Sequence, residues 1–380
     1  MCKLPFRNYH VLQILEGYEN QSYPLDLFIS HYFRNNKSLG SKDRGAIAEL
    51  IYSMVRWQGL IDYLTEKPIT WEKRFETYTS VTLKNYMEDE TIPLHTRLSF
   101  PKVLFELLLN SFSVEEATRL CRVSNQAAPT TVRANVLKIS RDELLSRFKE
   151  HYLVAPTRSA GNGITFLKKI NLFATPEFKA GFFEVQDEGS QLLASLVKAA
   201  PGQQIMDYCA GSGGKTLAFA PNMQNSGQIF LHDIRKNALA EAKIRLRRAG
   251  VQNAQIVHAE DEKRLKKLKK KMDVVLVDAP CSGTGTMRRN PDMKWSFSEE
   301  SVRRLIGEQR TIFEKALSFM HPKGKIIYAT CSILNEENQN QMHHFMKTYG
   351  LQLVEEPFQS FPQEGGMDGF FAATFKIKET

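Results

Sequence analysis

Two cysteines, Cys281 and Cys331, stand shortly after apolar runs that are typical of β-strands, and each opens a turn. If both runs belong to one parallel sheet, the two thiols lie at the same edge, where the strands end. A thiolate is a strong nucleophile, and a second thiol together with Asp278 would supply attack, proton transfer and product release. Most free cysteines are simply small buried hydrophobic residues, but two in matching positions indicate chemistry.

A glycine-rich segment follows the apolar run QQIMDY and is expected to form a turn between a strand and a helix. Such a turn lets a ligand approach backbone amides closely. Its residues are Cys209, Ala210, Gly211, Ser212, Gly213, Gly214 and Lys215. The segment lacks the first glycine of a phosphate-binding loop, where Cys209 stands, and the third glycine of a dinucleotide fingerprint, where Thr216 stands.

A third kind of site, for an adenosyl cofactor, needs an acidic residue after the next strand to hold the ribose hydroxyls. Asp233 stands at that position, and Asp261 follows the strand after it and could face an adenine. Asp207 ends the strand before the loop. Acidic residues after three successive strands favour a ligand site over a plain tight turn, although aspartates at such positions also cap helices, Asp261 above all.

The elements that must position these residues divide the chain into three predicted regions. Residues 1–124 place apolar side chains three and four apart, which predicts a helical domain with Ser113 as a helix cap. Residues 125–184 mix short strand-like runs with a helix that Ser140 begins, which predicts a small α/β module. Residues 185–380 alternate strand-like and helix-like runs, which predicts an α/β domain with a mostly parallel, doubly wound sheet.

The composition limits the environment and partners of the protein. A net charge of +9 over 380 residues is compatible with a polyanionic partner, although charge alone identifies none. The five cysteines include no CxxC pair, so we expect no disulfide framework, no metal site and a reducing cytoplasm. The N-terminus lacks the regions of a signal peptide, and no apolar run reaches the roughly 18 residues of a membrane span. We therefore expect a soluble, cytoplasmic protein without a membrane partner.

Several motifs together resemble the Sun/RsmB family of S-adenosylmethionine-dependent RNA cytosine-5 methyltransferases. They are DAPCSGTG with RRNPDMKW, YATCSILNEEN, VQDEGSQ and the closing GGMDGFFAATF. PTTVRANVLKISRDELL resembles the family's small RNA-contacting module, and DRGAIAELIYSMVRW resembles its NusB-like helical domain. The resemblance implies a Rossmann-like class I methyltransferase domain. The family's loop usually carries Ala-Pro before its two glycines, where this chain has Gly211-Ser212.

The resemblance also implies a cofactor and roles for the site residues. S-adenosyl-L-methionine would be held by the loop from Cys209 to Lys215 with Asp233, Asp261 and Asp278. Cys331 would add to carbon 6 of the base, and Asp278, protonated or sharing a proton, would donate to nitrogen 3. Cys281 would help to remove the proton of carbon 5 and free the product from Cys331.

Two residues of the basic loop, Arg288 and Lys294, are expected to contact RNA, with solvation of a surface as the simpler alternative for Lys294. The resemblance implies an enzyme that methylates 16S ribosomal RNA, with transfer RNA as the alternative substrate, and we expect a monomer. From other classes, Gly214-Lys215-Thr216 and the VLVD run leave a P-loop nucleotide hydrolase open. A noncatalytic RNA-binding assembly protein also remains open.

Overall fold

The computed structural model describes residues 5–21 and 23–378 and divides the chain into two compact units. One unit, here called the helical unit, comprises Met1–Ala127 and Thr286–Glu299. The other, the catalytic unit, comprises Ala128–Gly285 and Glu300–Thr380. The segment Thr286–Glu299, which the sequence places in the catalytic region, therefore belongs to the helical unit. Among the described residues, no helix has the length and apolar character needed to cross a membrane.

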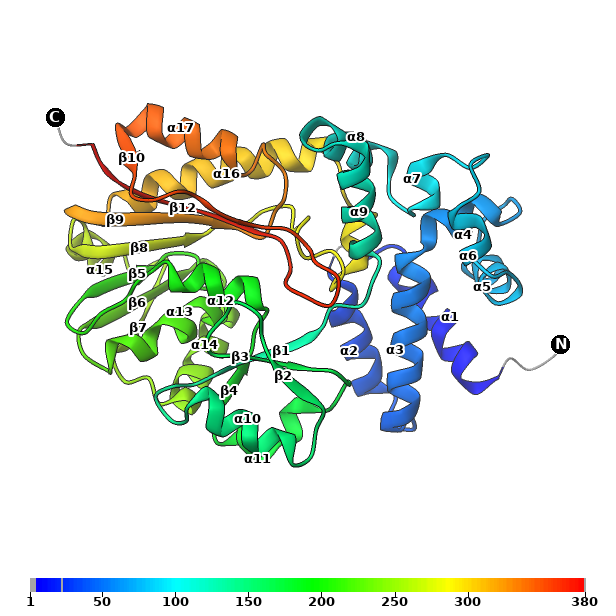
Figure 1. Ribbon diagram of the computed structural model, residues 1–380, viewed down its shortest axis with the longest axis horizontal. Helices are drawn as coiled ribbons and strands as arrows, with labels where there is room; N and C mark the ends of the chain where they lie inside the picture. Colours follow the sequence, from blue (N-terminus) through cyan, green and yellow to red (C-terminus); the bar gives the residue numbers. More distant parts are fainter. Residues whose placement is uncertain (1–4, 22, 379–380) are drawn as a thin grey trace. The chain divides into compact units, whose positions relative to one another are not determined.

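The helical unit is built from helices, as the spacing of its apolar residues predicts (Figure 1). Ser113 caps one of them by accepting a hydrogen bond from the Glu116 amide at 3.3 Å. Its helices are α1 (Phe6–Tyr18), α2 (Leu25–Asn35), α3 (Ser41–Arg56), α4 (Gln58–Leu64), α5 (Trp71–Ser80), α6 (Lys84–Met87), α7 (Leu94–Arg97), α8 (Lys102–Ser111) and α9 (Val114–Ser124).

The segment Thr286–Glu299 contains a short 3-10 helix, η3 (Pro291–Lys294), and completes the core of the helical unit. Trp295 packs against this core, and its indole donates a hydrogen bond to the Val55 carbonyl at 2.7 Å. Even a partly buried indole ring contributes a large apolar area, and this contact explains why the segment joins the helices.

A small antiparallel sheet in the catalytic unit has the strand order β2-β3-β1-β4. Val132, Ile164 and Phe183 from this sheet form a core with Phe148 from the adjoining helix. Ser140 caps that helix by accepting from the Glu143 amide at 3.2 Å, as predicted. The elements are β1 (Thr130–Ala134), α10 (Arg141–Lys149), β2 (Val154–Pro156), β3 (Gly163–Phe166), η1 (Leu172–Ala174), α11 (Pro176–Lys179) and β4 (Phe183–Val185).

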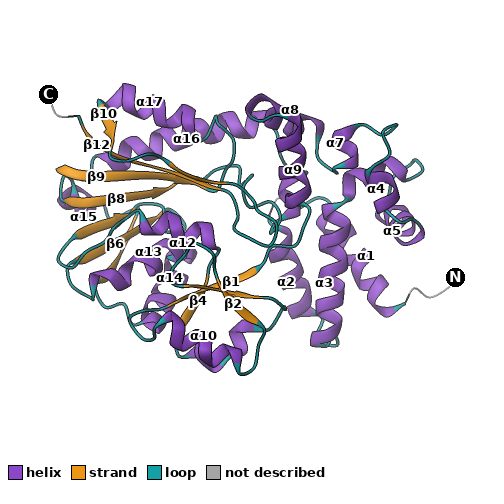
Figure 2. Cartoon of the chain, viewed as in Figure 1, coloured by secondary structure: helices purple, strands orange, loops and turns teal. Residues whose placement is uncertain are grey.

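The larger sheet of the catalytic unit has the order β10-β12-β9-β8-β5-β6-β7, with β11 paired to β12. Strands β5 to β9 are parallel and the C-terminal strands are antiparallel, which confirms the predicted mostly parallel, Rossmann-like sheet (Figure 2). The strands are β5 (Gln204–Asp207), β6 (Gln228–Asp233), β7 (Ala254–His258), β8 (Met272–Asp278), β9 (Met320–Thr330), β10 (Leu351–Leu353), β11 (Phe358–Ser360) and β12 (Phe370–Ile377). The helices are α12 (Glu188–Ser195), α13 (Gly214–Phe219), α14 (Lys236–Ala249), α15 (Glu262–Leu268), α16 (Glu299–Leu317) and α17 (Gln339–Tyr349), with η2 (Ala220–Met223).

Strand β8 shows why this sheet forms at the centre of the unit. Val274 and Leu276 point into the apolar core on one face, and Val275 and Val277 point into the core on the other. All four side chains are fully buried. A strand covered by helices on both faces needs a continuous apolar run of this kind, and the run ends at Asp278.

The small sheet is tied to the larger one by buried polar contacts. Glu184 of β4 forms ion pairs with Arg245 at 3.0 Å and with Arg248 at 2.5 Å, both on α14. The Asn135 amide donates to the Ala249 carbonyl at 2.8 Å. These contacts place the predicted module and the predicted catalytic region in one compact unit.

Candidate active site

The two cysteines meet at the carboxyl ends of two neighbouring strands. Asp278 of β8 pairs with Ala329 of β9, so the turns after both strands begin side by side. The Sγ atoms of Cys281 and Cys331 lie 3.4 Å apart, within hydrogen-bond distance for sulfur. Gly285 holds the two turns together, because its amide donates to the Cys331 carbonyl at 2.9 Å. The position requires glycine, since an added Cβ would lie 2.2 Å from the Gly369 carbonyl oxygen.

The proton arrangement of this pair follows from its surroundings. The hydrogen bond to Cys331, together with burial, raises the pKa of Cys281 well above its ordinary value. Cys281 therefore stays a thiol near neutral pH and can donate its proton in the hydrogen bond to Cys331. In that bond the Cys331 sulfur is the acceptor, and its deprotonated form would be the nucleophilic one.

A buried carboxylate that the sequence analysis missed fixes the turn after Cys281. Glu337 is fully buried and accepts hydrogen bonds from the Ser282 amide at 2.9 Å and from the Ser282 hydroxyl at 2.5 Å. The Gln309 amide group donates to the same side chain at 3.0 Å. The motif YATCSILNEEN contains Glu337, so the signal was present, but only the fold shows that this residue supports Cys281.

A lysine–aspartate pair lies in the same site. The Lys215 ammonium donates to the Asp278 carboxylate at 2.7 Å. Burial acts to lower the pKa of Lys215, but the charge of Asp278 and the hydrogen bond to it outweigh burial, and the pKa of Lys215 is raised. Asp278 accepts this hydrogen bond, and its predicted role as a proton donor to nitrogen 3 stays a prediction.

The glycine-rich loop joins β5 to α13 and holds its shape through positive φ angles at Gly211 (53°) and Gly213 (79°). The Gly211 amide donates to Asp233 at 2.8 Å. Arg245 donates to the carbonyl and the hydroxyl of Ser212 at 3.0 and 2.7 Å. These bonds fix the shape of the loop at Gly211-Ser212.

The other loop residues have mainly structural contacts. Burial raises the pKa of Cys209 well above its ordinary value, so this thiol stays protonated and packs against the core beside β8. Ala210 belongs to the core on the opposite face of the sheet. The Gly214 carbonyl accepts a hydrogen bond from Gln186 at 3.2 Å.

Two aspartates beside the loop provide acceptor groups. Although burial opposes ionisation, hydrogen bonds from Arg235 and Gly211 hold the pKa of Asp233 below its ordinary value. Burial raises the pKa of Asp207 to about 7, and one of its carboxylate oxygens accepts from Thr216 at 2.7 Å. The other oxygen of Asp207 is buried and has no hydrogen-bond partner among the described residues. An unpaired buried acceptor of this kind is costly and suits a ligand that donates to it.

Asp261 lies at the start of α15 and caps it, since its carboxylate accepts from the Arg264 amide at 3.1 Å. It also lines a small pocket beyond the end of β7 with Lys236, His258 and Glu260. Its predicted contact with an adenine stays a prediction.

The prediction that Arg288 and Lys294 contact RNA is wrong for this structure. Arg288 is 2% exposed and Lys294 is not exposed at all, both within the helical unit. The Lys294 ammonium donates to the carbonyls of Arg56 and Ser99 and to the Asn125 side chain, at 2.7, 2.9 and 2.8 Å. The sequence identifies the basic residues of this loop. Only the fold shows that protein oxygens surround the side-chain nitrogen of Lys294.

Lys294→Met is expected to lower the free energy of unfolding by about 3 kcal/mol, because it leaves three buried oxygens without a donor. Chemical denaturation of the full chain would measure the change. The matched control is Lys323→Met, an exposed lysine, which should alter stability by less than about 0.5 kcal/mol. Equal effects of the two substitutions would show that the buried contacts of Lys294 contribute nothing.

Comparisons with known proteins agree with this geometry. Residues 194–376 match the family model described as 16S rRNA methyltransferase RsmB/F, and residues 100–172 match a model described as an RsmF/B-like ferredoxin-like domain. The first range contains both thiols and the glycine-rich loop. The second begins in the helical unit, ahead of the predicted module boundary at residue 125.

Among similar proteins is a probable ribosomal RNA small subunit methyltransferase B of Synechocystis, 30% identical, with 77% of this chain and 70% of the relative aligned. A 28S rRNA (cytosine-C(5))-methyltransferase of Mus musculus is 29% identical over 74% of this chain and 39% of its own length.

Two solved structures share the fold. The protein PH0851 aligns with a TM-score of 0.80 and 21% identity over 96% of this chain and 97% of its own. NSun6 from Pyrococcus horikoshii, solved with SFG, aligns with a TM-score of 0.67 and 22% identity over 74% of this chain and 99% of its own.

Proposed function

Because this chain belongs to the RsmB/F family of methyltransferases, whose cofactor is S-adenosylmethionine, we propose that it methylates carbon 5 of a cytosine in small-subunit ribosomal RNA. The observation that carries the proposal is the thiol pair, with Sγ atoms 3.4 Å apart, at the strand ends that also hold Lys215 and Asp278. A methyl transfer to a heteroatom needs no covalent nucleophile, whereas carbon 5 of cytosine is too weakly nucleophilic to react unaided.

The residues at the glycine-rich loop fit S-adenosylmethionine. Its ribose hydroxyls are donors suited to the ionised Asp233, and its methionyl ammonium is a donor suited to the unpaired oxygen of Asp207. Gly211 and Gly213 leave the loop without side chains where the cofactor would approach. When bound, the cofactor supplies an electrophilic methyl group on its sulfonium.

Cys331 supplies the nucleophile in the proposed reaction. Its thiolate forms a bond to carbon 6, and the electron pair of the carbon 5–carbon 6 double bond moves toward nitrogen 3. The Lys215–Asp278 pair donates a proton to nitrogen 3, which leaves carbon 5 nucleophilic. Carbon 5 then forms the bond to the transferred methyl group, whose bond to the sulfonium sulfur breaks, so that S-adenosylhomocysteine is the second product.

Cys281 completes the reaction by removing the proton of carbon 5. Its pKa is raised first of all by the hydrogen bond to Cys331, and that bond is lost once the Cys331 sulfur is a thioether. Cys281 can then ionise by releasing its proton to solvent and take the carbon 5 proton. The electrons of that bond restore the double bond, the bond from carbon 6 to sulfur breaks, and nitrogen 3 returns its proton.

The choice of RNA rests on the relatives. The description of the family model and the name of the Synechocystis relative specify small-subunit ribosomal RNA. The name of the mouse relative specifies carbon 5 of cytosine as the methylated atom. The P-loop hydrolase alternative is not supported, because Lys215 is paired with Asp278 and the matching family is one of methyltransferases.

Bisulfite sequencing of RNA from cells with and without the gene tests the proposal. We expect one or a few cytosines of small-subunit ribosomal RNA to lose protection from deamination when the gene is deleted. Loss of protection only in transfer RNA would reassign the substrate. Unchanged RNA, together with magnesium-nucleotide binding but no S-adenosylhomocysteine binding in calorimetry, would overturn methyl transfer.

A further inference from the structure

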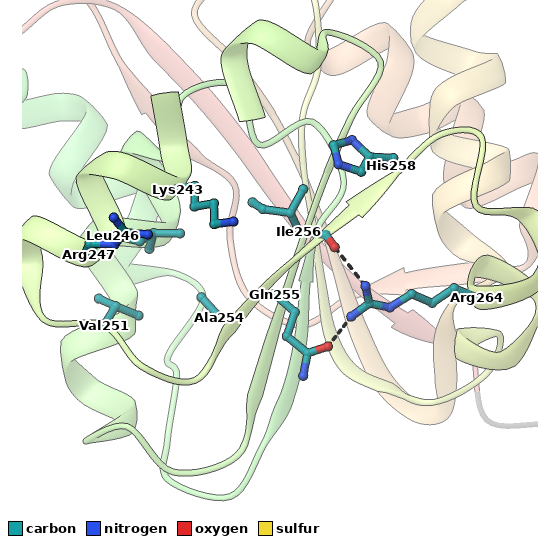
Figure 3. A pocket seen from close by; sticks show the side chains of 9 residues that line it. All are labelled: Lys243, Leu246, Arg247, Val251, Ala254, Gln255, Ile256, His258 and Arg264. Atoms are coloured by element: carbon teal, nitrogen blue, oxygen red, sulfur yellow. Dashed lines mark hydrogen bonds between the residues drawn. The ribbon is translucent and has the colours of Figure 1, made fainter. Parts of the chain in front are cut away.

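A basic groove runs along the outer edge of the large sheet, beside strand β7. It measures about 560 Å³ and lies between α14 and β7, with Arg264 of α15 at one side (Figure 3). Leu246 and Ile256 contribute apolar surface, and Lys243, Arg247, His258 and Arg264 contribute basic groups. Within the described part of the chain, no acidic side chain lines the groove. A concave surface with basic groups and no carboxylate attracts anions.

Four basic residues in the second half of α14 form two sets, which differ in whether they pair with an acidic side chain. Arg245 and Arg248 both pair with the buried Glu184 and thereby hold the small sheet. Lys243 and Arg247 are exposed and form no ion pair within residues 5–21 and 23–378. They stand four positions apart on one helix face, where like charges destabilise a helix by a few tenths of a kcal/mol. Packing within the protein does not account for this pair of charges.

The strand beside the groove is poorly suited to bind a peptide. Strand β7 pairs with β6 and, in the described ranges, with no other strand, so its outer edge is open. However, the Arg264 guanidinium donates to the Ile256 carbonyl at 3.0 Å and also bonds the Gln255 side chain. A backbone acceptor that an added strand would need is thus occupied, as on protected edge strands.

We propose that this groove binds the sugar-phosphate backbone of the RNA substrate at nucleotides flanking the target base. The identity of the RNA rests on the proposed function, whereas the groove's preference for a polyanion rests on its charges. Strand β7 lies four strand positions from β9, the strand that Cys331 follows, which is about 19 Å across the sheet. A single strand of RNA that places a base at Cys331 can therefore reach the groove within a few nucleotides. The apolar floor would pack against ribose, and the cationic side chains would pair with phosphates.

The test removes two charges from the groove. Lys243→Ala combined with Arg247→Ala keeps good helix formers on α14 and leaves the contacts of Arg245 and Arg248 in place. We expect affinity for small-subunit ribosomal RNA to fall about fivefold to tenfold. The slope of log affinity against log salt should become shallower by about 1.4, since each lost phosphate contact on a single strand contributes roughly 0.7. With S-adenosylmethionine saturating, KM for RNA should rise while kcat stays unchanged.

The matched control removes the same charge elsewhere on the catalytic unit. Lys323→Ala with Lys347→Ala changes two exposed lysines, one in β9 and one on α17, and should leave the salt slope unchanged. Equal slopes for the groove variant, the control variant and the unmodified protein would overturn the proposal. Weaker binding to the assembled small subunit with unchanged affinity for the naked RNA would assign the groove to a ribosomal protein and also overturn it.

The RNA-binding measurements test the groove assignment separately from the proposed methylation of cytosine. If the protein methylates no RNA but the groove variant still loses RNA affinity with a shallower salt slope, the groove assignment stands and the methylation proposal fails. If methylation of cytosine occurs and the groove variant binds RNA normally, the methylation proposal stands and the groove assignment fails.

Discussion

Cys331→Ala is expected to lower kcat for cytosine methylation by more than about 10³-fold, because no other described thiol can take its place against carbon 6. Cys281 lies 3.4 Å away but is held as a thiol by burial and by its hydrogen bond to Cys331. Transfer of labelled methyl groups to small-subunit ribosomal RNA would measure the loss. Binding of S-adenosylhomocysteine should be unchanged, because the glycine-rich loop and Asp233 keep their contacts.

Cys121→Ala is the matched control for this substitution. Cys121 is a fully buried cysteine of the helical unit, and burial raises the pKa of its thiol to about 12, so it takes no part in the proposed chemistry. This variant should keep its activity and lose about 1 kcal/mol of stability through the small cavity it creates. A fully active Cys331→Ala protein would end the assignment of the nucleophile.

Cys281→Ala is expected to trap the enzyme on its RNA. Cys331 can still add to carbon 6 and the methyl group can still be transferred, but the proton of carbon 5 is no longer removed efficiently. Since the bond from carbon 6 to sulfur breaks only after that proton leaves, the covalent complex should accumulate. A band of reduced mobility on a denaturing gel that disappears after ribonuclease treatment would show it, with turnover lowered by about 10² to 10⁴-fold.

The double variant Cys281→Ala with Cys331→Ala supplies the control for trapping. It keeps the RNA-binding surface and lacks both thiols, so it should give no shifted band. If Cys331→Ala formed the covalent band and Cys281→Ala did not, the two thiols would exchange roles, with Cys281 as the nucleophile and Cys331 as the base. Absence of the band in both single variants would contradict a covalent mechanism.

The main features of the catalytic sheet could be predicted from local patterns. The fully apolar run before Asp278 predicts a strand buried on both faces, and its alternate residues do enter the two cores. Because parallel strands place their carboxyl ends at one edge, the residues after β8 and β9 were expected to meet, and Cys281 and Cys331 do. Caps at Ser113 and Ser140 were equally predictable, since a cap depends on residues three positions apart.

Burial and charge pairing could not be predicted in the same way. Lys294 and Arg288 look like surface cations in a basic loop, but the loop folds into the helical unit. The acceptors of Lys294 at Arg56, Ser99 and Asn125 are more than 150 residues away in the sequence. No local pattern records such partners, and only the fold shows that burial lowers the pKa of Lys294 well below its ordinary value.

The sequence by itself determined the parallel sheet, the glycine-rich turn, the acidic residues after the strands and the meeting of the two thiols, because these follow from periodicities of a few residues and from the common direction of parallel strands. The tertiary structure alone decided that Lys215 donates to Asp278, that Glu337 supports Cys281, and that Lys243 and Arg247 line a groove free of acidic side chains among the described residues. The physical reason is that pKa values, desolvation and ion pairing depend on which distant groups come within a few ångströms, and packing determines those distances.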